Sequence, residues 1–189
     1  MSRPNLRKVR DFLNLIRNRL PGRSEILAVF SVAVFACHSW TVLGFFNKLS
    51  SFVLYFNIGE ILSIFAYMMS VALLESIAVT ILLVLLGIIL PSGWLRDGFA
   101  YKGFIIIAIA TAASILFQKL LPDDYPSTLM LALSAILPLG LMVVTIVISQ
   151  SIPRLRSLFL DVQDRISIMS YIYVPIGIIS LMVVLIRNL

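Results

Sequence analysis

The sequence predicts an all-α fold, a polytopic transmembrane helical bundle of about five spans, and three observations support this fold class. Hydrophobic residues fill 60% of the 189 positions and charged residues only 13%, whereas soluble domains carry about 25% charged residues. The apolar residues gather into blocks long enough for the ~20 residues with which a helix crosses a bilayer. None of these blocks alternates apolar and polar residues, so helices rather than a barrel satisfy the backbone.

Proline and glycine mark the breaks between the apolar blocks. Pro91 and Gly93 end one block, and the stretch "LPDDYPS" at 121–127 separates the next two, because these residues do not continue a helix. The expected spans are about 26–46, 63–90, 98–121, 127–150 and 167–186.

The apolar pattern of the second span begins earlier than a membrane helix requires. A single helix from Phe52 to Leu90 would be about 58 Å long, nearly twice the hydrocarbon thickness. We therefore expect the segment Phe52–Glu60 to lie along the outer surface or within the loop.

Two segments outside the spans have the pattern of amphipathic helices. Residues 1–24 are predicted to form a basic helix in the headgroup layer on the cytoplasmic face, and residues 25–189 a single transmembrane domain. The helix at 1–24 either anchors the first span or docks a cytoplasmic partner. Residues 151–167 form a second amphipathic segment between spans four and five, with nearly balanced charge. The basic residues expected at the membrane surface are Arg7, Lys8, Arg10, Arg17, Arg19 and Arg23.

The distribution of Lys and Arg predicts the orientation. With the N-terminus inside, twelve of the fifteen basic residues fall on inner segments, and only Lys48, Lys119 and Arg187 fall on outer ones. Short cytoplasmic loops are enriched in Lys and Arg. We expect a plasma (inner) membrane protein with its N-terminus in the cytoplasm and its C-terminus outside. The mitochondrial inner membrane is a less favoured alternative.

An acidic residue, Glu75, lies within the second span. The surrounding Leu, Ile and Val residues outweigh its insertion cost of about 3 kcal/mol, so the span inserts without a compensating partner. His38 lies at a similar depth in the first span, which runs antiparallel to the second. One hypothesis is that the two side chains meet and form a proton or cation site. The alternative is that each is satisfied separately by hydrogen bonds within the bundle.

Small and polar residues predict where the spans pack closely. On the second span, Gly87 shares a stripe with Ala72, Ser76 and Thr80 near Glu75. Such stripes let helices approach each other and share hydrogen bonds. The third span offers a surface with small-xxx-small spacing that we expect to match this stripe. Its members are Ala108, Ala112, Ala110 and Ser114.

The sequence carries no motif that names a reaction. It has no glycine-rich phosphate loop, no HExxH or GxSxG motif and only one cysteine, Cys37, so we expect no metal site and no cofactor. We expect a non-catalytic membrane component or scaffold of a larger assembly. The alternatives are a small oligomeric transporter subunit that uses Glu75 with His38, and a membrane-embedded enzyme without a recognisable motif. The expected partners are anionic lipids at the cytoplasmic face, other membrane or cytoplasmic subunits or further copies of the chain, but not nucleic acid.

Overall fold

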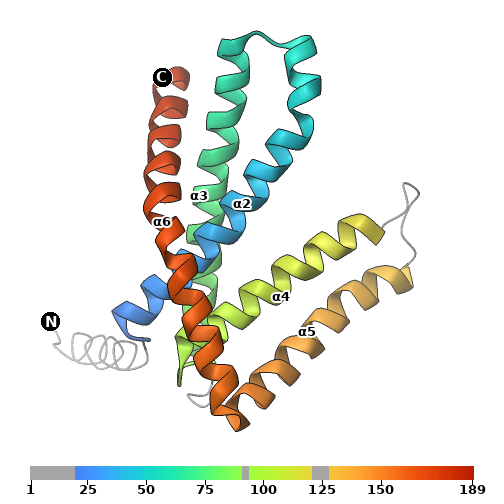
Figure 1. Cartoon of the computed structure of the whole chain (residues 1–189), viewed down its shortest axis with the longest axis vertical. Coiled ribbons are helices and arrows are strands. Elements are labelled where there is room, and N and C mark those ends of the chain that lie inside the picture. Colours follow the sequence, from blue (N-terminus) through green and yellow to red (C-terminus); the bar gives the residue numbers. More distant parts are fainter. Residues whose placement is uncertain (1–19, 91–93, 121–127) are drawn as a thin grey trace, which may run out of the picture.

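A computed structural model describes residues 20–90, 94–120 and 128–189, and this part of the chain is helical without strands (Figure 1). All five of its long helices are apolar and long enough to cross a membrane. The structure thus confirms the predicted all-α bundle with five spans. The helices are α2 (Arg23–Tyr55), α3 (Ile58–Ile89), α4 (Phe99–Leu120), α5 (Thr128–Ser151) and α6 (Pro153–Asn188).

The predicted third and fourth spans agree with α4 and α5 to within one residue at each end. The predicted helix at 1–24 falls mainly outside the described residues, as do Arg7, Lys8, Arg10, Arg17 and Arg19. Of the expected membrane-surface residues, only Arg23 is described, as the first residue of α2.

The segment between the first two spans differs from the prediction. α2 continues to Tyr55 and α3 begins at Ile58, so the segment Phe52–Glu60 is mostly helical, and the expected loop is reduced to a turn at Phe56 and Asn57. The Asn57 side chain accepts a hydrogen bond from the Glu60 amide, and the Glu60 carboxylate accepts one from the Asn57 amide, both at 2.9 Å. This capping box starts α3 immediately after the turn. Two long antiparallel helices therefore replace a loop and a shorter span.

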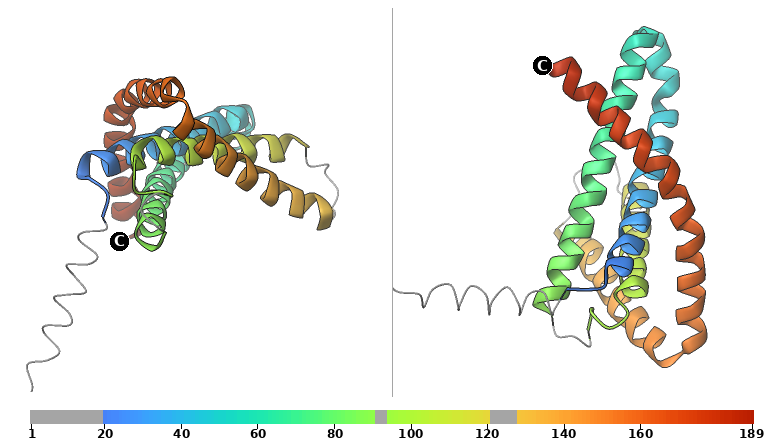
Figure 2. Two further views of the ribbon diagram at one scale, coloured as in Figure 1. Left: turned by 90° about the horizontal axis from the view of Figure 1, so that it is seen from below. Right: turned by 90° about the vertical axis from the view of Figure 1, so that its left-hand side faces the viewer.

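Residues 153–167 of the segment that was predicted to form a second amphipathic helix are helical, but they do not form a separate helix. They are the first part of α6, which runs for 36 residues and includes the fifth span. The reason is that no proline or glycine lies between Arg154 and Val174 to end the helix. Pro175 lies inside α6, and Figure 2 shows that α6 changes direction partway along its length.

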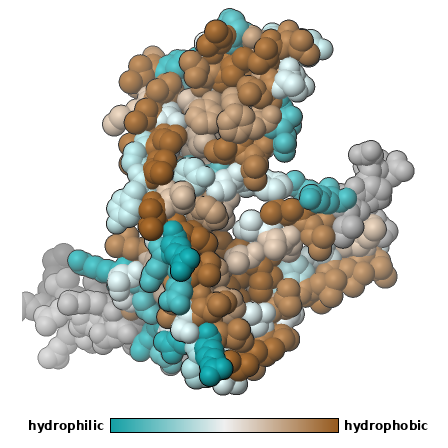
Figure 3. All heavy atoms as spheres, in the orientation of Figure 1, coloured by the Kyte–Doolittle hydropathy of each residue, from teal (hydrophilic) through white to brown (hydrophobic). Residues whose placement is uncertain are grey.

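Three helices, α2, α3 and α6, pack together, while α4 packs against α2, α5 and α6. Figure 1 shows the α4–α5 hairpin pointing away from this three-helix group. Ser149 is the buried residue of α5, and Figure 3 shows hydrophobic residues along α5. The helix α5 therefore presents most of its apolar surface to the outside of the chain, whereas the first part of α4 is buried. The buried hydrophobic core lies where α2, α3 and α4 meet, and it includes Val29, Val32, Ala33, Leu83, Leu95, Phe99, Phe104, Ile105 and Ile107.

The contact between α2 and α4 depends on a glycine. Gly103 is buried, and a Cβ at this position would lie 2.5 Å from Cγ2 of Val29. Val29 is itself fully buried and β-branched, so its side chain has little freedom to move aside. Gly103 thus sets how closely the two helices approach.

Gly103→Ala should lower the free energy of unfolding by about 1–3 kcal/mol, because the added methyl group overpacks this contact. Gly140→Ala is the matched control, since a Cβ there meets nothing within 4 Å. The control should be neutral or stabilising by up to about 1 kcal/mol. Thermal unfolding midpoints in detergent measure both, and equal midpoints would contradict the close approach of α2 and α4.

Candidate functional site

His38 lies where α2, α3 and α6 meet. It is fully buried, its ring stacks on Tyr173 with centroids 5.3 Å apart, and its Nδ1 donates to the Val34 carbonyl at 3.0 Å. This hydrogen bond leaves Nε2 as an acceptor in the neutral ring. Among the described residues Nε2 has no hydrogen-bond partner. It faces Gly177, where a Cβ would lie 3.1 Å from Nε2 and 3.1 Å from Cβ of Leu73.

Further polar contacts join α2 and α6 on either side of His38. The hydroxyl groups of Ser39 and Tyr173 are 3.2 Å apart, and the Ser31 hydroxyl donates to that of Ser170 at 3.4 Å. In a membrane, hydrogen bonds of this kind between helices contribute about 0.6–2 kcal/mol each. They help to fix α6 against α2.

The side of α6 that faces the other helices carries polar residues along much of its length. Gln163 is buried, and both its side-chain polar atoms lack a partner among the described residues. At the other end, the Asn188 side chain donates to the Tyr67 hydroxyl at 2.6 Å. Gln163 and Asn188 are about 37 Å apart along the helix, a little more than the hydrocarbon thickness. We call this set the α6 polar seam: Gln163, Ser170, Tyr173, Gly177, Ser180 and Asn188.

Glu75 does not belong to the seam. Its side chain is exposed, and it lies near enough to Cys37 of α2 for an electrostatic interaction. The next residue, Ser76, is buried and donates to the Ala72 carbonyl at 2.7 Å. The structure shows no hydrogen bond or ion pair between Glu75 and His38, which packs against α6. The two residues that the sequence suggested as one site therefore occupy different environments.

The predicted packing residues divide into two groups. Gly87 is buried, and a Cβ there would lie 3.4 Å from the Phe99 ring at the start of α4. The small residues of α4 are not brought against α3, because the first half of α4 packs on α2 and the second half turns away with α5. The exposed members of this surface are Ala108, Ala110, Ala112 and Ser114.

Sequence reasoning missed a polar cavity of about 360 Å³ at the end of the molecule where α4 and α6 start. Lys102 and Arg156, which line this cavity, contributed to the sequence-based interpretation only through the count of basic residues that predicts the orientation. The available signal was that aromatic, charged and polar residues lie on both sides of the α5–α6 connection and at the start of α4. We call this cavity the basal pocket, and it is lined by Asp97, Gly98, Tyr101, Lys102, Ser149, Gln150, Pro153 and Arg156.

The described residues include no group of three or more His, Cys, Asp or Glu side chains arranged to hold a metal ion. Comparisons of the chain with protein-family models, with curated proteins and with solved structures found no match.

Proposed function

We propose that this chain is a non-catalytic membrane component of a larger assembly, and that a partner covers the outward face of α3 around Glu75. The observation that carries this proposal is the exposed carboxylate on a membrane-spanning helix. Acidic side chains within membranes almost always face protein or a water-filled cavity. A partner protein that covers this face of α3 in the assembly would account for an acidic side chain on the outer surface of the single chain.

The depth of Glu75 supports this argument. It lies about 25 Å from the start of α3 and about 21 Å from its end along the helix axis. A hydrocarbon layer about 30 Å thick that is centred on α3 therefore surrounds this position. The side chain is too far from either end of α3 to reach water as a solvated terminal residue does.

The α4–α5 hairpin offers a second surface for assembly. The exposed small residues of α4, for example Ala108 and Ala112, let another helix approach closely. No residue of the most apolar stretch of α5 is buried within the chain. A partner helix, from another subunit or a second copy, would bury surface that this chain leaves open.

Glu75→Leu should weaken the assembly, because it removes the polar group that a partner would contact. Loss of one hydrogen bond between helices, about 1–2 kcal/mol, raises the dissociation constant about five- to thirtyfold. The measurement is native mass after gentle detergent extraction. Glu60→Gln is the matched control, since glutamine also completes the capping box at the start of α3.

In this experiment the wild type and Glu60→Gln should keep a mass above the 21.1 kDa of one chain, and Glu75→Leu should shift toward the single chain. A wild-type protein that runs as one chain in every mild detergent would contradict the proposal.

A second candidate function, a proton or cation path, is favoured by the α6 polar seam. The seam places hydroxyl groups between helices that span the membrane, beside Nε2 of His38, which has no hydrogen-bond partner in the described part of the chain. Ionisable residues in such interiors often line proton or ion pathways. In this version His38 acts with Tyr173 and Ser39 rather than with Glu75.

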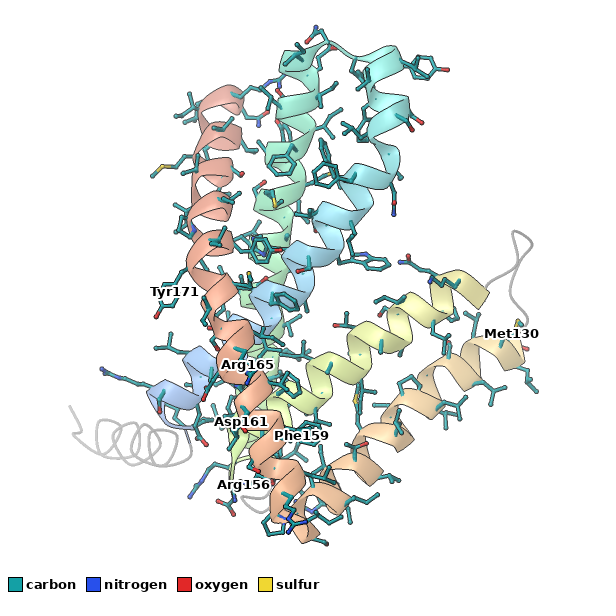
Figure 4. The ribbon with its side chains drawn as sticks, in the orientation of Figure 1. Met130, Arg156, Phe159, Asp161, Arg165 and Tyr171 are labelled. Carbon is teal, nitrogen blue, oxygen red and sulfur yellow. The ribbon has the colours of Figure 1, made fainter. Side chains whose placement is uncertain are left out.

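Tyr173→Phe tests the proton path, because it removes the hydroxyl group that contacts Ser39. Tyr171→Phe is the matched control, since Tyr171 is 81% exposed and points away from the bundle (Figure 4). If the seam conducts protons, proton flux into proteoliposomes should fall severalfold in Tyr173→Phe and stay unchanged in the control. Wild-type flux no higher than that of protein-free vesicles would exclude this function.

We also propose that the chain resides in a plasma (inner) membrane, with its N-terminus in the cytoplasm and its C-terminus outside. The support is that basic residues gather at the end of the molecule where α2, α4 and α6 start, which fits a cytoplasmic face. Figure 4 shows three of the charged residues of this end on the lower half of α6. The described basic residues at this end are Arg23, Arg96, Lys102, Arg154, Arg156 and Arg165, against Lys48, Lys119 and Arg187 elsewhere.

A reporter fusion at the C-terminus tests this orientation. Alkaline phosphatase fused after Leu189 should be active, because it folds only outside the cytoplasm, and green fluorescent protein at the same site should stay dark. A fluorescent C-terminal fusion would place this end inside and overturn the orientation.

A further inference from the structure

The basal pocket brings together three helix ends that are distant in sequence. Gly98 directly precedes α4 and Lys102 lies in its first turn, Ser149 and Gln150 come from the end of α5, and Arg156 comes from the first turn of α6. Figure 4 shows Arg156 at the lower end of α6, on the same side of the molecule as the start of α4. The pocket is therefore a product of the tertiary structure.

Tyr101 lines the pocket, and two cationic side chains contact its ring. Nζ of Lys102 lies 5.7 Å from the ring centroid and Cζ of Arg156 lies 5.1 Å from it. Contacts at these distances are attractive and hold cations against an aromatic face. Lys102 and Tyr101 are almost fully buried, whereas Arg156 is exposed. The Lys102 ammonium group is thus buried in the wall of the pocket, whereas the Arg156 guanidinium group is accessible at its rim.

Gly98 holds this arrangement in place. Its φ is +75°, a conformation that favours glycine, and a Cβ at this position would overlap the Tyr101 ring. Because residue 98 is a glycine, the backbone can turn into α4 at this position while the Tyr101 ring packs against the backbone of Gly98. The backbone conformation at Gly98 therefore allows the Tyr101 ring to occupy its place in the pocket wall without a ligand.

The charges of the pocket favour an anion. Among the described residues that line it, Asp97 is the single carboxylate, against two cationic side chains, Lys102 and Arg156. The starts of α4 and α6 add the partial positive charge of helix N-termini. Lysine and arginine are the residues that proteins use most for phosphate groups, and Arg156 can bind two phosphate oxygens at once. The Gln150 amide supplies a further donor.

We propose that the basal pocket binds an anionic phosphate group, either that of a membrane phospholipid headgroup or inorganic phosphate. The pocket lies where α4 and α6 begin, the level at which spanning helices meet the lipid headgroups. About 360 Å³ accommodates a phosphate and the small polar group attached to it. This inference is independent of the proposed assembly and proton functions, because none of the pocket residues belongs to the Glu75 face or to the α6 polar seam.

The test uses the full chain, delipidated in detergent and then mixed with phosphatidylglycerol, phosphatidylcholine or inorganic phosphate. Native mass spectrometry counts the retained lipid, and thermal unfolding reports protection by phosphate. The wild type should retain phosphatidylglycerol in preference to phosphatidylcholine. Arg156→Gln should lower this retention about tenfold, because a hydrogen bond between charged groups is lost.

Two further variants keep the test independent of misfolding. Arg154→Gln removes the same charge from the same turn of α6 at a residue that does not line the pocket, so its retention should stay within about twofold of the wild type. Asp97→Asn removes the carboxylate of the pocket and should raise retention severalfold, a gain that no damaged fold would produce.

The arms of the experiment distinguish the sources of the phosphate. Protection by millimolar inorganic phosphate without lipid, lost in Arg156→Gln, would support the site and assign it to soluble phosphate. Equal losses in Arg156→Gln and Arg154→Gln would overturn the proposal, because they show only a general charge effect. Absence of both lipid retention and phosphate protection in the wild type would overturn it as well.

Discussion

The structure depends on one constraint, that backbone amides and carbonyls within hydrocarbon must bond to each other. This constraint makes every described span a helix, and it leaves side-chain contacts to decide how the helices associate. The decisive contact is at Gly177, where the absence of a side chain lets His38 of α2 and Leu73 of α3 reach α6. Gly103 plays the same part between α4 and α2. Small residues at two crossing points thus determine the arrangement of four helices.

Polar residues are distributed unequally around this framework. Those on the α6 side of the bundle are buried or half-buried, and several bond to a neighbouring helix or to their own backbone, as the half-buried Ser39, Tyr173 and Ser170 do. Glu75 lies on the outside, and the cationic residues of the basal pocket lie at one end. These three environments differ in burial and in charge. Glu75 and His38 lie in two of them, one exposed and one buried, and no hydrogen bond or ion pair joins the two side chains.

Hydropathy and turn residues predicted the class of fold and the limits of α4 and α5, because Pro122, Pro126 and Gly93 interrupt otherwise continuous apolar sequence. The turn at Asn57 was missed, although Asn57 and Glu60 have the spacing of a capping box. The pairing of helices was beyond sequence reasoning, since apolar residues occur around most of each span and several spans carry small residues. For this reason the stripe of α3 was assigned to α4, whereas Ser76 lies against Ala33 of α2. The basal pocket was missed because its residues come from three separate segments.

The helices of this protein differ in length, and the surrounding lipid must accommodate the difference. The helices α2, α3 and α6 have 33, 32 and 36 residues, or about 48–54 Å, while α4 and α5 have 22 and 24, or about 33–36 Å. The hairpin matches an ordinary bilayer, but the three longer helices exceed it and must tilt or protrude. Lipids on one flank of the protein therefore meet longer helices than lipids on the other. A difference of this kind is accommodated by tilt of the longer helices or by a local change in the thickness of the bilayer.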